Sequence, residues 1–147
     1  MELERYEGNP ILTARDFPQE VNSVFNAGAI KYGDEYILLN RVQRLDGTSC
    51  LWVARSRDGY HFTPDPEPAM LPSTEEPFAR YEEYGIEDPR ITKIDDIYYI
   101  TYVCYSSLDC RVGLALTKDF KDFQRVGLIS LPDNKDAVLF PQKIGKR

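Results

Sequence analysis

A repeated hairpin constrains the fold of this 147-residue chain more than any other feature of its sequence. Residues 27–32 and 36–41 flank a Gly-Asp turn, and residues 91–94 and 98–105 flank an Asp-Asp turn. Short runs of this kind around a tight turn predict β-hairpins. The copies align at a separation of 62 positions (93 − 31). The matched residues are Lys31, Asp34 and Tyr36 in the first copy and Lys93, Asp96 and Tyr98 in the second.

Each hairpin is followed by a further predicted strand, at residues 50–55 in the first copy and 111–116 in the second. The next turns contain Asp58 and Asp119, which lie at equivalent positions. An aspartate that recurs in every copy is more often a turn former than a catalytic group. A third copy begins at about Phe140, where the hairpin motif starts again.

Units of about four short strands are typical of the blades of a β-propeller. Blade-like repeats lie at about 24–63 and 88–125, and a third begins near 138. Propellers have at least about four blades, so we expect one all-β domain over residues 1–147, an incomplete propeller of about two and a half blades. An ordinary β-sandwich with chance similarity is the alternative. Open strand edges favour self-association, and we expect a homo-oligomer.

Composition excludes several classes of protein. The net charge is −6 with no basic block, which argues against nucleic acid or an anionic membrane as the partner. No apolar run approaches the length of a transmembrane helix. The three cysteines, Cys50, Cys104 and Cys110, show no metal-ligand spacing and are odd in number. We therefore expect reduced thiols, no metal site and a cytoplasmic location.

The stretch from Glu82 to Thr92 holds the strongest candidate for chemistry. Pro89 disfavours the α conformation at Asp88 and suits the first position of a strand, so we expect Asp88 in an extended or turn conformation at the mouth of a sheet. A carboxylate held on stiff backbone suits a catalytic acid. A surface Asp-Pro turn with Arg90 as a local ion-pair partner is the structural alternative.

Several motifs follow one another along the chain. They are Asn9-Pro10-Ile11-Leu12, Val24-Phe25-Asn26-Ala27-Gly28, Leu39-Asn40-Arg41, Ser56-Arg57-Asp58-Gly59, Gly85-Ile86-Glu87-Asp88-Pro89-Arg90-Ile91-Thr92 and residues 134–141. In this order they resemble glycoside hydrolase family 130, which contains β-1,4-mannoside and mannooligosaccharide phosphorylases and some β-mannosidases. The resemblance covers residues 9–146, and Glu87 to Arg90 is its most specific part. It implies a five-bladed β-propeller with a sugar site at the central axis, of which this chain is similar to the N-terminal half.

The resemblance also implies roles for individual residues. Asp88 would be the catalytic acid and would pass its proton to the glycosidic oxygen through a hydroxyl of the bound mannose. Asn26, Arg41 and Arg90 match substrate-binding positions. Lys135 matches a phosphate-facing position that often holds arginine. Inorganic phosphate would be the co-substrate, with no other cofactor, and its attack with inversion on a β-mannoside oligosaccharide would transfer the glycosyl group and release mannose 1-phosphate.

Two departures from the family pattern weaken this expectation. Gln142 stands where the family often has glutamate, and further phosphate-binding cations would lie beyond Arg147, so the chain alone is expected to be inactive. A β-mannosidase or another propeller glycosidase is one alternative function. A non-catalytic glycan-binding or assembly module is another.

Three other side chains have two interpretations each. Trp52 is either a core residue or a platform on which a sugar ring stacks, and the core is favoured. His61 is expected to pack on a strand formed by residues 60–62 rather than act as a base. Glu87 could support Arg90 or Asp88, and a close pair of carboxylates would raise the pKa of one of them.

Overall fold

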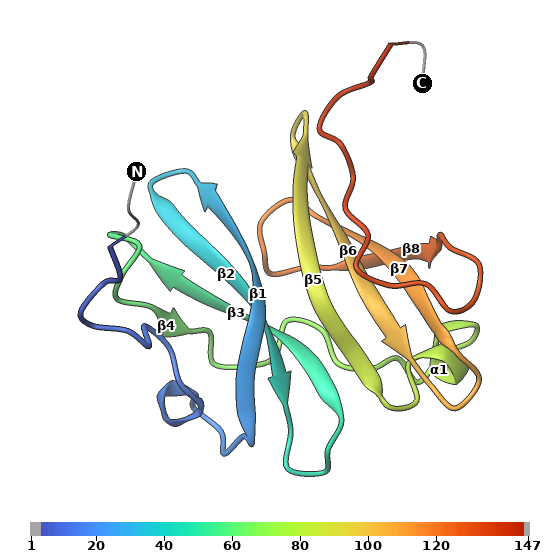
Figure 1. The fold of residues 1–147 in the computed structure, drawn as a ribbon, viewed down its shortest axis with the longest axis horizontal. Helices are drawn as coiled ribbons and strands as arrows, with labels where there is room; N and C mark the ends of the chain where they lie inside the picture. The colour runs from blue at the N-terminus through green and yellow to red at the C-terminus, as the bar shows by residue number, and fades with distance from the viewer. Residues whose placement is uncertain (1–3, 146–147) are drawn as a thin grey trace.

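The computed structural model describes residues 4–145 and shows two four-stranded antiparallel units that lie side by side (Figure 1). The first unit contains β1 (Ser23–Tyr32), β2 (Glu35–Gln43), β3 (Ser49–Ser56) and β4 (Thr63–Pro64). The second contains β5 (Gly85–Ile94), β6 (Ile97–Tyr105), β7 (Cys110–Thr117) and β8 (Gln124–Leu128). A 3-10 turn, η1 (Ala14–Asp16), precedes the first unit, and a single helical turn, α1 (Phe78–Tyr81), lies between the units.

The two units are joined into one mixed, open sheet at a single parallel pair, Ser49 of β3 and Gly85 of β5. Gly85 has a φ of 126°, and a Cβ at this position would collide with the backbone of Ser49. Glycine is therefore required where the second unit meets the first. The all-β prediction is confirmed at this level.

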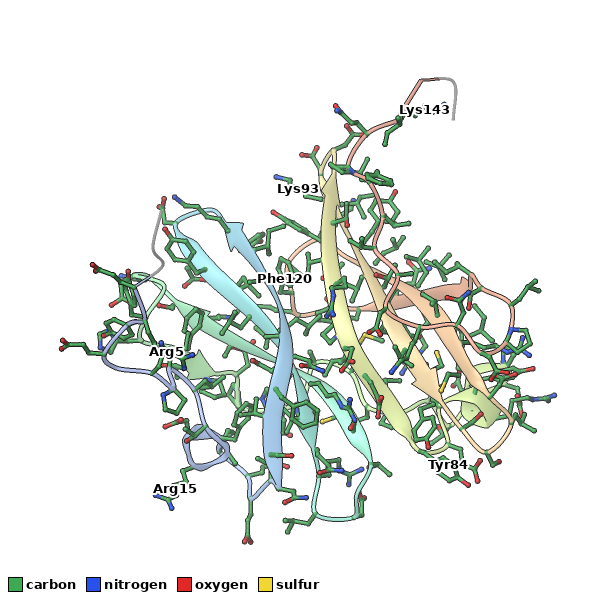
Figure 2. All side chains as sticks on the ribbon, viewed as in Figure 1. Arg5, Arg15, Tyr84, Lys93, Phe120 and Lys143 are labelled. Carbon is green, nitrogen blue, oxygen red and sulfur yellow. The ribbon has the colours of Figure 1, made fainter. Side chains whose placement is uncertain are left out.

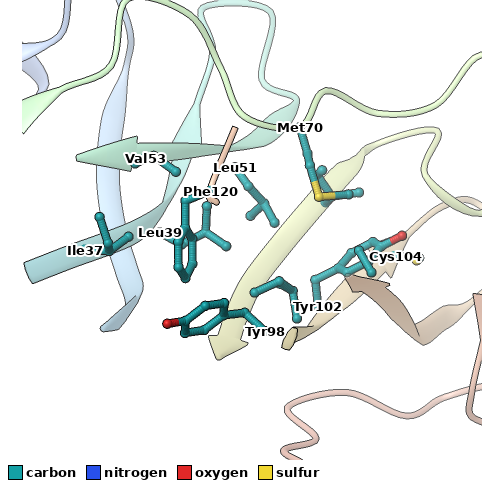
Figure 3. Close-up of a cluster of buried hydrophobic side chains, with 12 residues drawn as sticks. Ile37, Leu39, Leu51, Val53, Met70, Tyr98, Tyr102, Cys104 and Phe120 are labelled. Carbon is teal, nitrogen blue, oxygen red and sulfur yellow. The ribbon is translucent and has the colours of Figure 1, made fainter. Parts of the chain in front are cut away.

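The main core lies between the two units (Figure 3). Apolar side chains on one face of β2 and β3 pack against those on β6, with Phe120 from the β7–β8 turn beside them. Its buried members are Ile37, Leu39, Leu51, Val53, Met70, Ile86, Tyr98, Ile100, Tyr102, Cys104, Ala115 and Phe120. Each unit has an apolar face that only a neighbouring unit covers, as expected for stacked repeats.

A smaller cluster covers the opposite face of the first unit. Trp52 is 1% exposed, meets the Phe17 ring edge-on at 5.3 Å and donates from Nε1 to the carbonyl of Asp65 at 2.7 Å. The core interpretation of Trp52 is therefore confirmed, since no sugar ring can reach it. Cys50 and Cys104 are buried, unpaired thiols. Burial raises the pKa of Cys50 to about 11 and that of Cys104 to about 12.

Glu82 is a fully buried carboxylate that links its own segment of the chain to three others. It accepts hydrogen bonds from Arg125 Nε at 3.0 Å and Nη2 at 2.8 Å, from the Tyr102 hydroxyl at 2.9 Å and from the Ser73 amide at 2.7 Å. A buried charge is tolerated only when it is paired and hydrogen-bonded in this way. The network fixes the chain just before β5 begins.

The turn aspartates form the same structure in both units. Asp58 Oδ1 accepts from the amides of Tyr60 and His61, and Asp119 Oδ1 accepts from those of Lys121 and Asp122. The prediction that these residues are turn formers is confirmed.

Sequence reasoning was wrong about His61. Residues 60–62 form no strand, the next strand is β4 at Thr63–Pro64, and the His61 side chain is 81% exposed. Its ring lies 2.7 Å from Asp58, because the turn directs it toward that carboxylate and away from the core. β8 was not predicted.

The segment after β8 has no strand within the described residues up to 145. It passes over β6 and then runs beside β5 (Figure 1), where the hydroxyls of Thr101 and Thr92 donate to the carbonyls of Ala137 and Leu139. A third repeat near residue 138 stays a prediction. No helix among residues 4–145 is long and apolar enough to span a membrane.

We predict that Glu82→Ala lowers the free energy of unfolding by about 3–5 kcal/mol, because the half-buried Arg125 and the buried Tyr102 hydroxyl both lose their partner. Urea unfolding followed by circular dichroism measures this. Glu83→Ala is the matched control, because Glu83 is the next residue along the chain and its own carboxylate lies at the surface. Equal losses in the two variants would show that the buried network does not stabilise the fold.

The turn aspartates also predict a dependence of stability on pH. Backbone donors from His61 and Lys121 hold the pKa of Asp58 and Asp119 below the usual value. A carboxyl whose pKa is lower in the folded state stabilises the fold above its unfolded pKa of about 4, and this contribution disappears as the pH falls through the folded value.

The double variant Asp58→Asn, Asp119→Asn should therefore be less stable than wild type at pH 7. The difference between their melting temperatures should narrow steadily as the pH falls below about 4. A difference that stays constant from pH 7 to pH 3 would contradict this account of the turns.

Candidate active site

The first strands of the two units, β1 and β5, carry matching β-bulges. The register of β1 shifts between Phe25 and Gly28, and that of β5 shifts between Glu87 and Arg90. The bulged residues have left-handed backbone, with φ of 48° at Asn26 and 50° at Asp88. Short polar side chains tolerate this conformation better than other non-glycine residues do.

Two expectations about the Asp-Pro pair need correction. Asp88 is neither extended nor in a surface turn, but in the left-handed region inside a strand. Pro89 is likewise inside β5 and does not begin it. The bulge interrupts the ladder of hydrogen bonds here, so a proline without an amide hydrogen fits.

The two bulges face each other across the junction of the units. β1 and β5 come so close at Gly28 that a Cβ there would lie 2.9 Å from the carbonyl oxygen of Pro89 and 3.1 Å from the Ile91 side chain. Figure 2 shows Tyr84 near one end of β5 and Lys93 near the other, so the Asp88 bulge lies along the middle of this strand.

A polar cluster forms where the bulges meet. Asn26 Nδ2 donates to Asp88 Oδ1 at 3.0 Å, and Arg41 Nη1 donates to the same oxygen at 3.1 Å. Arg41 Nη2 donates to Glu87 Oε1 at 2.6 Å, and its Nε donates to Ser49 Oγ at 3.1 Å. The guanidinium of Arg41 also lies 4.5 Å from the centre of the Phe25 ring, in cation–π geometry.

The cluster is partly buried and holds more negative than positive charge. The side chains of Arg41, Glu87 and Asp88 are 17%, 18% and 12% exposed. The pKa of Glu87 is raised, mainly by burial and further by the charge of Asp88, while the guanidinium of Arg41 opposes the shift. The positive charge of Lys135 acts on Glu87 in the same direction as Arg41.

The other two candidate residues lie beside this cluster. Arg90 Nη1 donates to the carbonyl of Pro89 at 3.1 Å and to that of Asp88 at 3.4 Å, so it contacts the backbone of the bulge and not the carboxylate. Lys135 is 64% exposed and lies 4.0 Å from Asp136. Sequence reasoning did not find the contacts of Ser49 and Phe25 with Arg41, because neither residue type signals a site by itself.

The polar cluster around Asp88 combines groups that can transfer protons and bind hydroxyls. Five hollows of about 380–590 Å³ on the described part of the chain are lined by other residues. A carboxylate oriented by an amide and a guanidinium can accept and return a proton. Amide and guanidinium groups also bind sugar hydroxyls. The arrangement fits acid–base chemistry on a polyhydroxylated ligand.

Comparison with known proteins agrees with this class of site. Residues 1–146 match the model of glycoside hydrolase family 130, which is described as beta-1,4-mannooligosaccharide phosphorylase. The chain belongs to this family, as the resemblance of its motifs indicated.

Individual relatives support the same conclusion. The chain is 30% identical to a beta-1,2-mannobiose phosphorylase of Listeria innocua, over 98% of this chain and 56% of the relative. It is 32% identical to a beta-1,4-mannooligosaccharide phosphorylase of Ruminococcus albus, over 95% of this chain and 43% of the relative. The structure of the Listeria innocua enzyme with beta-1,2-mannobiose superposes with a TM-score of 0.85, at 30% identity and over the same shares of the two chains.

A more distant structure shows the fold alone. Sucrose-6-phosphate hydrolase from Lactobacillus gasseri superposes with a TM-score of 0.59 at 18% identity, over 73% of this chain and 22% of that one. The chain spans about half the length of the curated relatives that it matches.

We predict that Gly28→Ala lowers the free energy of unfolding by about 1–3 kcal/mol, because β1 must move away from Pro89 to admit the methyl group. The movement should also lengthen the contact between Asn26 and Asp88. A crystal structure of the variant and its urea unfolding curve measure both effects. Gly127→Ala is the control, since a Cβ there meets nothing within 4 Å. Unchanged stability and an unchanged contact in Gly28→Ala would contradict the close approach of the bulges.

Proposed function

We propose that this chain forms part of a mannoside phosphorylase and supplies its general acid, Asp88. One observation carries the proposal. Matching bulges bring the first strands of the two units together, and there the Asp88 carboxylate accepts hydrogen bonds from Asn26 of β1 and Arg41 of β2. A turn aspartate would not need donors from the neighbouring unit. Membership of glycoside hydrolase family 130 supports the substrate class.

The proposed reaction is an inverting phosphorolysis. Asp88 gives up its proton, which reaches the glycosidic oxygen through a hydroxyl of the bound mannose. The bond from the anomeric carbon to that oxygen breaks, a phosphate oxygen attacks the anomeric carbon from the opposite face, and mannose 1-phosphate leaves with the inverted configuration. Phosphate is already an anion, so the reaction requires cations to hold it and no strong base. The transfer of a mannosyl group to phosphate makes this a glycosyltransferase-type reaction.

Individual residues have distinct parts in the proposal. Asn26 and Arg41 bind mannose hydroxyls while they orient Asp88, and Arg90 braces the backbone of the bulge through two carbonyls. Lys135 attracts phosphate from an exposed loop that lies close enough to act on Glu87. The relatives include phosphorylases of β-1,2 and of β-1,4 linkages, so the proposal extends to β-mannosides and to neither linkage in particular.

We also propose that the two units are the first blades of a five-bladed propeller and that residues from 138 onward begin a third. Ile37, Leu39 and Leu51 are the face of the first unit that the second unit covers. In the repeat alignment, Leu39 is equivalent to Thr101 of the second unit. The Thr101 hydroxyl donates a hydrogen bond to the carbonyl of Ala137, so the segment after β8 lies on this equivalent face. In this proposal, the described chain forms part of the propeller ring and carries part of its sugar site.

We also propose that the protein forms a homo-oligomer through an exposed apolar surface after β8. Large apolar side chains are exposed after β8, and such a surface is a site of association. They are Leu131, Val138, Phe140 and Ile144, which are 59–81% exposed. A cytoplasmic location, inferred from the cysteines, stays a prediction.

The proposal is tested with the full gene product that carries residues 1–147, assayed with phosphate and β-1,2- and β-1,4-mannobiose for release of mannose 1-phosphate. Asp88→Asn should lower kcat by about 10²- to 10⁴-fold, the usual contribution of general acid catalysis. Lys135→Ala should instead raise the KM for phosphate, since one of several cations is lost. Asp95→Asn, in the β5–β6 turn, is the matched control and should keep wild-type turnover.

Near-wild-type turnover in Asp88→Asn would overturn the assignment of the acid. The 147 residues alone should release no mannose 1-phosphate, because they span only about half the length of the related phosphorylases. Mannobiose binding without turnover by the full gene product would instead favour a glycan-binding module.

A further inference from the structure

Glu87 and Asp88 are consecutive residues of β5, yet they contact the same guanidinium. Successive side chains of a regular strand point to opposite faces of the sheet. The bulge changes this, because the left-handed backbone at Asp88 turns its side chain toward the junction with β1. As a result Arg41 bridges the two carboxylates, at 2.6 Å from Glu87 and 3.1 Å from Asp88.

Arg41 has three contacts besides the one with Asp88. Nη2 is bound by Glu87, Nε is bound by Ser49, and the plane lies over Phe25. A guanidinium is rigid and planar, so fixing two of its nitrogens fixes the third. The direction of Nη1 toward Asp88 is therefore set by contacts that Asp88 does not make itself. The contact with Glu87 is the shortest of them and the one between opposite charges, and such hydrogen bonds are the strong ones.

Both hydrogen-bond donors to the Asp88 carboxylate bind the same oxygen, Oδ1. Within residues 4–145, the hydrogen bonds to the Asp88 carboxylate come from Asn26 and Arg41 and end on Oδ1. An oxygen that already accepts two hydrogen bonds is a poor place for a proton, which leaves Oδ2 as the proton carrier.

We propose that Glu87 is a positioning residue, which fixes Arg41 so that Arg41 and Asn26 hold Oδ1 of Asp88 and leave Oδ2 to carry the proton to the substrate. The proposal rests on the proposed function of Asp88 as the acid. Glu87 touches neither substrate nor phosphate in this account, and it acts through Arg41.

The first test is kinetic and uses the full gene product. Glu87→Ala should lower kcat by about 10- to 100-fold, the range expected when an aligned catalytic group is displaced by about 1 Å. The KM for mannobiose should also rise, because Arg41 binds the substrate, but by a smaller factor than kcat falls. Glu87→Gln keeps an acceptor for Nη2 and should recover part of the loss. Glu35→Gln is the matched control, since Glu35 pairs with Arg55 at 3.6 Å in a different part of the fold and should keep wild-type kinetics.

A double-variant comparison separates positioning from a direct role. In an Arg41→Ala background, adding Glu87→Ala should lower kcat by less than about twofold, because residues that act through one another are not additive. An equal fold-loss in both backgrounds would overturn the proposal. So would a Glu87→Ala enzyme with wild-type kcat while Asp88→Asn is inactive.

A second measurement does not depend on activity. In the 147-residue chain, the Nη1 hydrogens of Arg41, which point toward Asp88, should exchange slowly with solvent by NMR in wild type and in Glu35→Gln, and at least about tenfold faster in Glu87→Ala. If the full gene product shows no phosphorolysis, the proposed function fails, and this exchange rate alone decides whether Glu87 fixes Arg41. Unchanged exchange in Glu87→Ala would refute the positioning role whatever the kinetics show.

Discussion

The hydrogen bond between Asn26 and Asp88 ties together the first strands of two repeat units, and the rest of the candidate site depends on it. Each residue lies in a bulge with left-handed backbone, and the bond measures 3.0 Å. Left-handed backbone is unfavourable for residues with a side chain and persists where the surroundings over-determine it. Here the close approach at Gly28 supplies that constraint. The repeat is therefore both the architecture of the protein and the means by which two equivalent positions, 62 residues apart, meet in one cluster.

Two buried features keep this junction rigid. The apolar core lies between the units, so neither unit can move without exposing side chains such as Leu39 and Ile100, which are fully buried. The Glu82 network anchors the chain immediately before β5 through Arg125 and Tyr102. Burying a carboxylate costs free energy that its partners only offset, so the arrangement is better explained by fixed geometry than by net stability. A rigid frame is what a positioned acid requires.

Much of this was predictable from the repeat. The 62-residue separation of the hairpins also aligns Asn26 with Asp88, and the turn aspartates were assigned correctly. The left-handed bulges were not predictable, because Asp before proline normally indicates an extended or turn residue. The bond from Arg41 to Glu87 was not predicted, because Glu87 was expected to support Arg90 or Asp88 and the bulge that brings both carboxylates to Arg41 was not foreseen. The exposure of His61 was missed because its Asp58 partner was read only as a turn former.

In the proposed reaction, Asp88 supplies the proton that the leaving oxygen needs. The most direct measurement compares two substrates of Asp88→Asn in the full gene product: β-mannobiose, whose leaving hydroxyl must be protonated, and 2,4-dinitrophenyl β-mannoside, whose leaving group departs as a stable anion. The account predicts a loss of about 10²- to 10⁴-fold in kcat with mannobiose and a loss of less than about tenfold with the dinitrophenyl substrate. Equal losses with both substrates would contradict it, because the variant would then have damaged binding or folding and not proton transfer.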